Sequence, residues 1–549
     1  MKTICKKSLS VLFAVLLMAT LWMGVMPVQA EGEGAFSLSY EIAERTVTIV
    51  GCHPDMEGEL EIPATVESLP VTAIRDSAFQ GCDKLTSVVI PEGVVAIGDR
   101  AFNGCTMLQS ITIPNSVISI GKNSFYGCKE LTTVAIPVGV VAIGDDAFGE
   151  CVNLTYIDVA EENAAYCDVD GIVFSKDMTR LVRYPSNHNI VEYVIPNSVT
   201  TIGMRAFFGC GRLKSVTIPE TVTAIESSAF HFCPSLHEVA IPASMQAIDF
   251  GVFSSCTGLV SVTIPDSVKT IGSYAFSGCT DLVSVTIPDS VESIGNNAFS
   301  GCVSLSKVAI PESVTAIGSS AFAFCSGLMS VEIPDNVRVL GPRAFSFCND
   351  LRSATLGAGL TTIAKETFLG CWKLTKVSIS ENVTVIDEYA FHYCPALNNV
   401  VLPDGLTVIG HGAFDGCAAL TEMTIPAGVT VLEGSVFRDC VKLTQVTIPV
   451  GVTTVEHSAF LGCKTLAAVQ YGGTNLDREK MTISTENAPL LDAKWQYAEI
   501  IEEQPEEEPL TFPEPAPQES PLKKLILYGC IVLATIVFLV VLLRKKPRD

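Results

Sequence analysis

A unit of 23 residues repeats along most of this 549-residue chain and limits what the chain can fold into. Sixteen cysteines mark its phase: four from Cys82 to Cys151 and twelve from Cys210 to Cys463, each 23 residues after the one before it in its run. A phenylalanine stands three residues before each cysteine and a leucine three residues after it. A fixed period of about 20–50 residues indicates a solenoid, in which each repeat packs only on its neighbours. We therefore predict one long, thin core.

Two segments of each repeat predict short strands. The first, V-x-I-P, occurs for example at residues 285–288, where alternating branched residues and a closing proline are typical of a strand with one buried face. The second, V-x-x-I-G, follows at residues 291–295. The A-F-x-x-C segment predicts a tight turn or a short helix. Serine and threonine dominate between the inward-facing residues of the first strand, so the exposed face lacks the paired carboxylates that glycoside hydrolysis requires.

The complete pattern, L-x-x-V-x-I-P-x-x-V-x-x-I-G-x-x-A-F-x-x-C, resembles the leucine-rich repeats of the BspA-like, or treponemal-type, cell-surface proteins. The resemblance covers roughly residues 60–469. It implies a repeat solenoid: a curved, right-handed leucine-rich-repeat array of about 16 regular repeats with a parallel β-sheet on its concave side. It also implies a function, because BspA-like relatives are associated with adhesion to host matrix proteins and to other microbes.

Caps and one insert interrupt or close the repeats. Residues 31–59 contain two strand-like runs and predict an N-terminal β-hairpin cap, as in other BspA-like arrays. The 59 residues from Cys151 to Cys210 predict a β-hairpin insert, at about residues 160–195, that leaves the solenoid and rejoins it at Ile195. Residues 470–498 lose the period and resemble the terminal cap of the family.

The two ends of the chain predict secretion and anchoring. Residues 1–30 have the lysines, apolar run and small final residues of a signal peptide. Residues 499–522 are rich in glutamate and proline and predict an extended acidic stalk. Residues 523–543 predict a transmembrane helix with flanking lysines, and residues 544–549 a basic cytoplasmic tail. We therefore predict a single-pass type I protein of the cell membrane with extracellular repeats, from a Gram-positive bacterium, with a protist as the alternative.

Charge and cysteine placement exclude several functions. The net charge is −24, and both ends are basic, so the part between them is strongly acidic and disfavours nucleic acid as a partner. Since the sixteen cysteines occupy one repeat position, their side chains should lie parallel, and we predict free, buried thiols with Cys52 and Cys167 as the exceptions. No metal-ligand or catalytic spacing occurs. We predict no catalytic residues, no cofactor, no metal and no enzymatic activity.

Departures from the repeat supply the candidate binding residues. Phe324 and Phe347 replace the usual glycine before the cysteine in adjacent repeats and predict an exposed aromatic patch. The alternative is that such rings only cover the turn. Aromatic residues at the same position of other repeats, and three polar or aromatic residues of the insert, complete the set: Phe232, Tyr393, Asp170, Arg183 and Tyr184.

The partners we expect are extracellular proteins or glycans, together with the membrane through the C-terminal helix. An insert on one face of a solenoid is often a binding element, although it can also be a tolerated decoration. The alternative function is a structural or self-assembling component of the cell envelope without a specific ligand.

Overall fold

The computed structural model describes residues 26–29, 37–53 and 55–498. The predicted stalk, transmembrane helix and tail lie outside the described residues, as does most of the predicted signal peptide. Four residues of that peptide form strand β1 (Met26–Gln29), which pairs with the next strand of the chain. Within the described ranges, no helix is long and apolar enough to cross a membrane.

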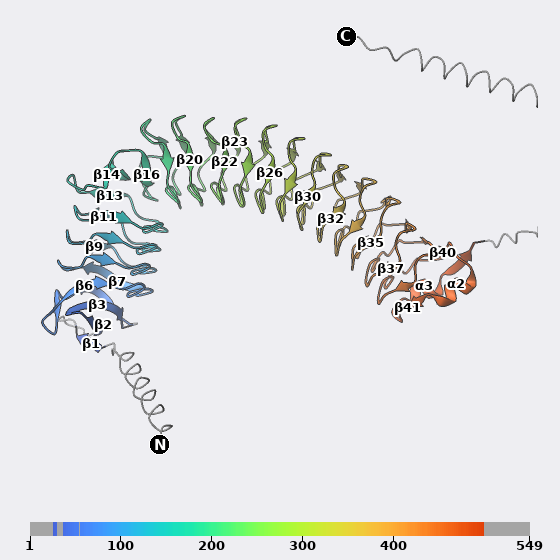
Figure 1. Ribbon diagram of the computed structural model, residues 1–549, viewed down its shortest axis with the longest axis horizontal. Helices are drawn as coiled ribbons and strands as arrows, with labels where there is room; N and C mark the ends of the chain where they lie inside the picture. The colour runs from blue at the N-terminus through green and yellow to red at the C-terminus, as the bar shows by residue number, and fades with distance from the viewer. Residues whose placement is uncertain (1–25, 30–36, 54, 499–549) are drawn as a thin grey trace, which may run out of the picture. The chain divides into compact units, whose positions relative to one another are not determined.

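Most repeats contribute two short strands, and the turns follow one another in chain order (Figure 1). At Asn399 the first strand is reduced to an isolated bridge with Lys376. The first strand usually pairs in parallel with its counterpart in the next repeat, as Val285 does with Val308. The pairing is interrupted in places, for example between Lys307–Ala309 and Ser330–Glu332, so the first strands form several sheets. The central residue of such a strand is buried and the two flanking residues are exposed, so the exposed face is formed by the small hydroxyl-bearing residues that the sequence predicts. These strands are β7 (Lys84–Val89), β9 (Ser110–Thr112), β11 (Thr133–Ile136), β13 (Tyr156–Val159), β17 (Glu192–Val194), β19 (Ser215–Thr217), β21 (Glu238–Ala240), β23 (Ser261–Thr263), β25 (Ser284–Thr286), β27 (Lys307–Ala309), β29 (Ser330–Glu332), β31 (Ser353–Thr355), β33 (Lys376–Ser378), β36 (Glu422–Thr424), β38 (Gln445–Ile448) and β40 (Ala468–Tyr471).

The second strand has two residues, of which the last is usually buried. In most repeats it also pairs in parallel with the next repeat, as Ile294 does with Ile317, and these strands too form several sheets. These strands are β8 (Ala96–Ile97), β10 (Ser119–Ile120), β12 (Ala142–Ile143), β18 (Thr201–Ile202), β20 (Ala224–Ile225), β22 (Ala247–Ile248), β24 (Thr270–Ile271), β26 (Ser293–Ile294), β28 (Ala316–Ile317), β30 (Val339–Leu340), β32 (Thr362–Ile363), β34 (Val385–Ile386), β35 (Val408–Ile409), β37 (Val431–Leu432), β39 (Thr454–Val455) and β41 (Thr482–Ile483).

The A-F-x-x-C segment is a hydrogen-bonded turn, which stacks on the turns before and after it. The backbone N–H of Phe276 donates to the carbonyl of Ala298 in the next repeat at 2.8 Å. The ring of Phe276 stacks on that of Phe299, with centroids 5.3 Å apart and planes 9° from parallel. Ala298, fully buried beside the ring, leaves the space that the ring needs. A column of stacked rings therefore runs inside the solenoid.

Each cysteine ties its repeat to the repeat before it. The Sγ of Cys279 donates to the carbonyl of Phe253, 26 residues earlier, at 3.1 Å. The Phe253 carbonyl also accepts from the backbone N–H of Cys256 at 3.3 Å, so the thiol is a second donor to a buried carbonyl as well as a small apolar group. The prediction of free, buried thiols is confirmed at the cysteines that make this bond: Cys105, Cys128, Cys151, Cys210, Cys233, Cys256, Cys279, Cys302, Cys325, Cys348, Cys371, Cys394, Cys417, Cys440 and Cys463.

Cys82 is the first of the sixteen cysteines that mark the repeats, which we call the ladder cysteines, and it differs from the other fifteen. No phenylalanine turn precedes it, and its sulfur instead forms a disulfide with Cys52 in the N-terminal cap. The prediction that every ladder cysteine is free is therefore wrong at Cys82. Cys52, one of the two cysteines outside the ladder whose pairing the sequence left open, is its partner. Cys167 was the other expected exception, but it is free and half-buried.

The N-terminal cap is the predicted β-hairpin. Strands β2 (Ser37–Ala43) and β3 (Thr46–Cys52) pair antiparallel through a two-residue turn in which both residues, Glu44 and Arg45, have positive φ. Strand β3 then pairs in parallel with β6 (Leu69–Ile74), so the hairpin covers the open edge of the first turn. Two further strands complete this end: β4 (Glu57–Glu61), which pairs with β7, and β5 (Thr65–Val66), which pairs with β6.

The C-terminal cap closes the last turn with two short helices and a strand. Helices α2 (Asn475–Lys480) and α3 (Ala488–Asp492) precede β42 (Lys494–Tyr497), which pairs in parallel with β40. The fully buried Asn487 accepts from the N–H of Phe460 at 2.9 Å. That N–H would donate to the next repeat elsewhere in the array, so one cap side chain replaces the missing turn.

We expect Phe276→Ala to destabilise the protein strongly, because it removes one ring from the middle of the column and leaves a cavity. Core Phe→Ala changes typically cost about 3–5 kcal/mol. The free energy of unfolding, measured by urea denaturation, checks this. Phe250→Ala is the matched control, since the ring of Phe250 is 52% exposed and its loss should cost below about 1 kcal/mol. Equal losses in the two variants would contradict a stabilising column.

We expect the protein to lose stability between about pH 9 and pH 12. Burial raises the pKa of the Cys105, Cys325 and Cys463 thiols to about 12, from 9.0. In this range the unfolded chain binds fewer protons than the native one, so the free energy of unfolding falls as the pH rises. Below pH 9 the contribution is fully present.

Urea midpoints measured from pH 7 to pH 11 check this expectation. A Cys302→Ala, Cys325→Ala double variant is the comparison, because burial also raises the Cys302 pKa well above its ordinary value. The double variant should lose less stability than the parent between pH 9 and pH 11. If the stability of the parent and of the double variant fell equally between pH 9 and pH 11, the buried thiols would not be the cause of the loss.

Candidate binding site at the hairpin insert

The insert contains three antiparallel strands, and its last strand becomes part of the solenoid. Strand β14 (Tyr166–Val169) pairs with β15 (Ile172–Ser175), and β15 pairs with β16 (Arg180–Arg183). The predicted hairpin is therefore confirmed. However, β16 also pairs in parallel with β18 of the next repeat. The prediction that the hairpin leaves the solenoid and rejoins it at Ile195 is wrong, because β16 takes the place of a second strand.

Strand β15 separates two hydrophobic cores. Ile172 and Phe174 pack in the core that continues toward the C-terminus, whereas Val173 packs in the core that begins at the N-terminal cap. Alternate side chains of a strand point to opposite faces. The uninterrupted apolar run of these three residues is thus explained by burial on both faces.

Tyr184 takes the place of a phenylalanine in the ring column. Its ring is buried and stacks on that of Phe207 at 5.0 Å, and its carbonyl accepts from the thiol of Cys210 at 3.8 Å. Burial raises the pKa of its hydroxyl, which donates to the carbonyl of Ile190. Tyr184 was a candidate binding residue, but in the folded protein its side chain is inside the core.

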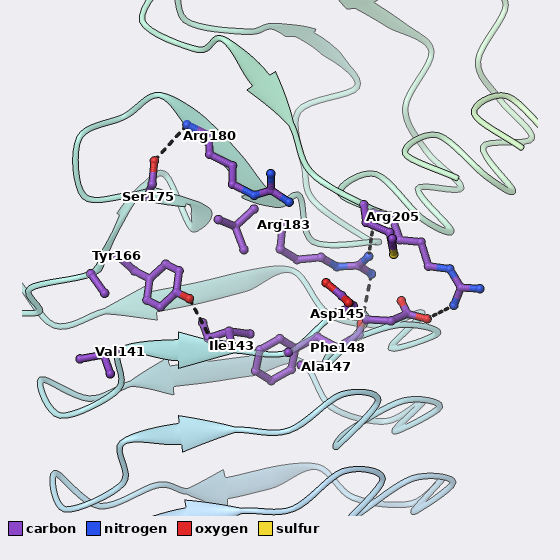
Figure 2. A pocket seen from close by; sticks show the side chains of 15 residues that line it. Val141, Ile143, Asp145, Ala147, Phe148, Tyr166, Ser175, Arg180, Arg183 and Arg205 are labelled. Atoms are coloured by element: carbon purple, nitrogen blue, oxygen red, sulfur yellow. Dashed lines mark hydrogen bonds and ion pairs between the residues drawn. The ribbon is translucent and has the colours of Figure 1, made fainter. Parts of the chain in front are cut away.

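Arg183, another candidate, is buried and joins the two parts of the array. Its guanidinium donates to the carbonyls of Phe148 at 3.1 Å, Arg205 at 2.8 Å and Phe208 at 3.2 Å. In the regular repeats, a cysteine of the next repeat donates to the phenylalanine carbonyl. No ladder cysteine follows Phe148 at that distance, and Arg183 provides the missing donor. Figure 2 shows it reaching from β16 toward the turn of Phe148.

A cavity of about 320 Å³ lies where the insert meets the turn of Phe148. Figure 2 shows the side chains around it, which come from that turn, from the three strands of the insert and from the following repeat. Two ion pairs fix the positions of charged side chains at this cavity. Arg180 pairs with Glu226 at 2.6 Å, and Arg205 pairs with Asp146. The hydrogen bond with Arg180 lowers the pKa of Glu226, and the bond with Glu226 raises the pKa of Arg180.

The third insert candidate, Asp170, is exposed at the tip of the hairpin. With Gly171 it forms the turn between β14 and β15, and both residues have positive φ, which an Asp-Gly pair accommodates readily. Its carbonyl contacts the ring Nε2 of His188 at 2.8 Å. Asp170 therefore has a local structural role and does not line the cavity.

The four aromatic candidates do not form one surface. Phe324 and Phe347 stack with ring centroids 5.0 Å apart, and Phe324 is 51% exposed, which is the arrangement that the sequence predicts. Phe347 also lies over the next turn, where a Cβ on Gly370 would approach its ring to 2.7 Å. The two rings therefore form an exposed aromatic pair, as predicted, and one of them also covers a turn, as the alternative interpretation has it. Phe232 and Tyr393 are exposed in separate repeats.

Sequence reasoning missed most of the residues that surround the cavity. Asp146, Tyr166 and Arg205 occupy ordinary positions in the sequence and come together only because the insert replaces a turn. One signal was present: Tyr184 stands 23 residues before Phe207 and so keeps the phase of the column. Among the residues that the structure describes, no three potential metal ligands come together.

The stacked turns, with two parallel strands in each, define a leucine-rich-repeat solenoid. The chain belongs to the family described as the BspA type leucine rich repeat region, whose profile matches residues 60–179, 183–302, 251–375 and 361–480. Members of this class are repeat scaffolds that typically have no enzymatic activity.

Several solved structures are similar to this chain. A leucine-rich repeat protein from Bacteroides ovatus is 26% identical, with 84% of this chain and 98% of that one covered and a TM-score of 0.43. A leucine rich cell surface protein from Faecalibacterium prausnitzii is 23% identical, with 84% and 99% covered and a TM-score of 0.36. A leucine-rich repeat protein from Eubacterium ventriosum is 22% identical, with 71% and 95% covered and a TM-score of 0.37. No curated protein matches the sequence.

We expect Arg183→Met to weaken the junction between the two parts of the array. It leaves the buried carbonyl of Phe148 without its donor, and a buried group without a partner costs about 1–3 kcal/mol. Urea unfolding should therefore show a lower midpoint and a broader or divided transition, since the cooperativity of a solenoid depends on its interfaces. Arg338→Met, at an exposed arginine that donates to the carbonyl of Asp335, should leave the transition unchanged. The same curve for both variants would contradict the joining role of Arg183.

Proposed function

We propose that this chain is a cell-surface recognition protein that binds extracellular proteins or glycans through side chains displayed on its repeats. Membership of the BspA-type family supports this proposal, and so does the secretory signal and membrane anchor that the sequence predicts at the two ends. In this arrangement the repeats lie outside the membrane and the last residues in the cytoplasm.

The observation that carries the proposal is the stacked pair Phe324 and Phe347. Both residues adopt positive φ, at 61° and 58°, at a position where most repeats have glycine. The left-handed conformation costs a residue with a Cβ about 1–2 kcal/mol. Phe324 is half exposed, so burial of its ring offsets little of this cost. Phe232 and Tyr393 share the positive φ and the exposure, so what distinguishes Phe324 and Phe347 is that their rings stack in adjacent repeats. Clustered aromatic residues are typical of binding hot spots.

Binding of the full-length protein to immobilised fibronectin, fibrinogen and mucin, and to whole microbial cells, tests the proposal. The variant is Phe324→Gly, Phe347→Gly, which introduces the residue that most repeats already have and should therefore preserve the fold. We expect saturable binding to one of these ligands and a loss of affinity of about 30-fold or more in the variant, as for interface hot spots.

The control is Phe232→Gly, which removes an isolated ring from the same turn position and should leave the affinity unchanged. Deleting the insert is not a suitable test, because β15 and β16 complete both cores. Binding to none of these ligands by the folded protein would contradict the proposal and favour a structural component of the envelope.

A further inference from the structure

Two of the seven histidines of the chain occupy the same repeat position, one on each side of a glycine. The position lies six residues before the ladder cysteine, and only there do two histidines flank a glycine in successive repeats. The histidines are 46 residues apart, which is twice the repeat, so no local ligand motif reveals them. From the first ladder repeat to the last, the position holds Asp76, Asp99, Lys122, Asp145, Met204, Ser227, Phe250, Ser273, Asn296, Ser319, Pro342, Lys365, Glu388, His411, Gly434 and His457.

The turns that contain these three residues stack directly on one another. The N–H of Gly412 donates to the carbonyl of Gly434 at 3.0 Å, and the N–H of Ser435 donates to the carbonyl of His457 at 3.0 Å. The first two of these turns follow strands β35 and β37, which Figure 1 labels near the C-terminal end of the array. An ordinary side chain at the middle position would therefore stand between the two histidines.

The missing side chain of Gly434 lets the two imidazole rings meet. The ring centroids of His411 and His457 are 5.8 Å apart. A Cβ on Gly434 would lie 2.9 Å from the Nδ1 of His411 and 2.7 Å from the Cε1 of His457, which is bonded to both ring nitrogens. Gly434 is not among the residues with positive φ, so its backbone does not need glycine. What glycine provides here is the room in which the rings approach.

The surroundings of the pair restrain one ring and favour a cation. The ring of His411 packs edge-on against that of Tyr389, with centroids 5.3 Å apart, which limits its rotation. His457 is exposed, so its ring is free to turn. The carboxylate of Glu456 accepts from the N–H of Gly434 at 3.0 Å and places a negative charge beside the pair.

Two facing imidazoles are the ligands that Zn²⁺, Ni²⁺ and Cu²⁺ take readily. A metal–nitrogen distance of about 2.0–2.1 Å and a tetrahedral angle put the centroids of two ligand rings on the order of 5 Å apart. The observed 5.8 Å is close to this value, and a small rotation of His457 closes the difference. Within the described ranges no group of three potential ligands comes together, so the protein supplies two ligands and water the others.

We propose that His411 and His457 bind one divalent transition-metal ion of the Zn²⁺ class, through one nitrogen of each imidazole, with water in the remaining positions. The ion links the repeats before and after that of Gly434, close to the C-terminal cap. This site goes beyond the recognition function proposed above and uses neither Phe324 nor Phe347, so the failure of one proposal leaves the other standing.

The first test is titration of the chelator-treated, full-length protein with Zn²⁺, Ni²⁺, Mg²⁺ and Ca²⁺, measured by calorimetry. Mg²⁺ and Ca²⁺ prefer oxygen ligands and so report on binding by carboxylates of this acidic chain. We expect saturable binding of Zn²⁺ and Ni²⁺ and a higher urea midpoint when either is bound, since a ligand of the native state stabilises it. Absence of Zn²⁺ and Ni²⁺ binding, or equal binding of Ca²⁺, overturns the proposal.

His411→Ala and His457→Ala locate the site. Each variant should lose at least about tenfold in affinity for Ni²⁺, because loss of even an outer-shell partner of a metal costs about 10–100-fold. His237→Ala, at an exposed histidine outside the pair, is the control and should bind as the parent does. The EPR spectrum of bound Cu²⁺ should show coupling to two nitrogens in the parent and to fewer in His457→Ala. Unchanged affinity in both histidine variants would place the metal elsewhere, for example at Cys167.

Gly434→Ala tests the role of the missing side chain without removing a ligand. The added Cβ pushes apart two rings at the ends of flexible side chains, so the fold should persist while the affinity for Ni²⁺ falls about tenfold or more. Gly211→Ala is the matched control, because a Cβ there meets nothing within 4 Å. Equal urea midpoints of the two metal-free variants show that both are folded. Parent-like affinity in Gly434→Ala would contradict a site formed above this glycine.

Discussion

The contact between one turn and the next is the constraint on which the rest of the structure depends. A single repeat has two strands of two to six residues and cannot bury its own apolar face. Stacking supplies three kinds of contact at once: parallel strand pairs, ring against ring, and a thiol that donates to the phenylalanine carbonyl of the preceding repeat. All three act between neighbours, and the disulfide, the C-terminal cap contact and the insert occur where one of them is missing.

Three such places show three different solutions. At the start of the ladder Cys82 has no earlier carbonyl to reach, and it pairs with Cys52 of the cap. At the end, Asn487 accepts the N–H of Phe460. In the middle, Arg183 donates to the carbonyl of Phe148, but nothing within the described structure accepts from the N–H of that residue. The first two places are closed, whereas the third has a cavity beside it.

Much of the fold was predictable because the period is strict. The columns of cysteine and phenylalanine and the two strands per repeat follow from spacing and from alternation of apolar residues. The N-terminal cap was predictable from its two strand-like runs, and the C-terminal cap from its loss of period and its resemblance to the family's terminal cap. The insert was predictable as a hairpin, since Ile172, Val173 and Phe174 precede a polar turn and a second apolar run. The position of the insert in the sheet was not predictable, because pairing of β16 with β18 depends on where the chain returns in space. The role of Arg183 follows from that pairing, so the sequence did not predict it. The contact of Asp146 with Arg205 was not predictable for the same reason.

The bond from each cysteine to a phenylalanine 26 residues earlier also bears on how the number of repeats can change during evolution. Between Cys210 and Cys463 every repeat meets its neighbours through the same atoms, so loss or duplication of one whole 23-residue unit recreates the same bond across the new joint. The near-identical stretches at residues 262–282 and 285–305 are well suited to such an exchange at the level of the gene. Across the insert the same change would separate Tyr184 from Phe207 or Arg183 from Phe148. Array length is thus free to vary on the C-terminal side of the insert and fixed at the insert itself.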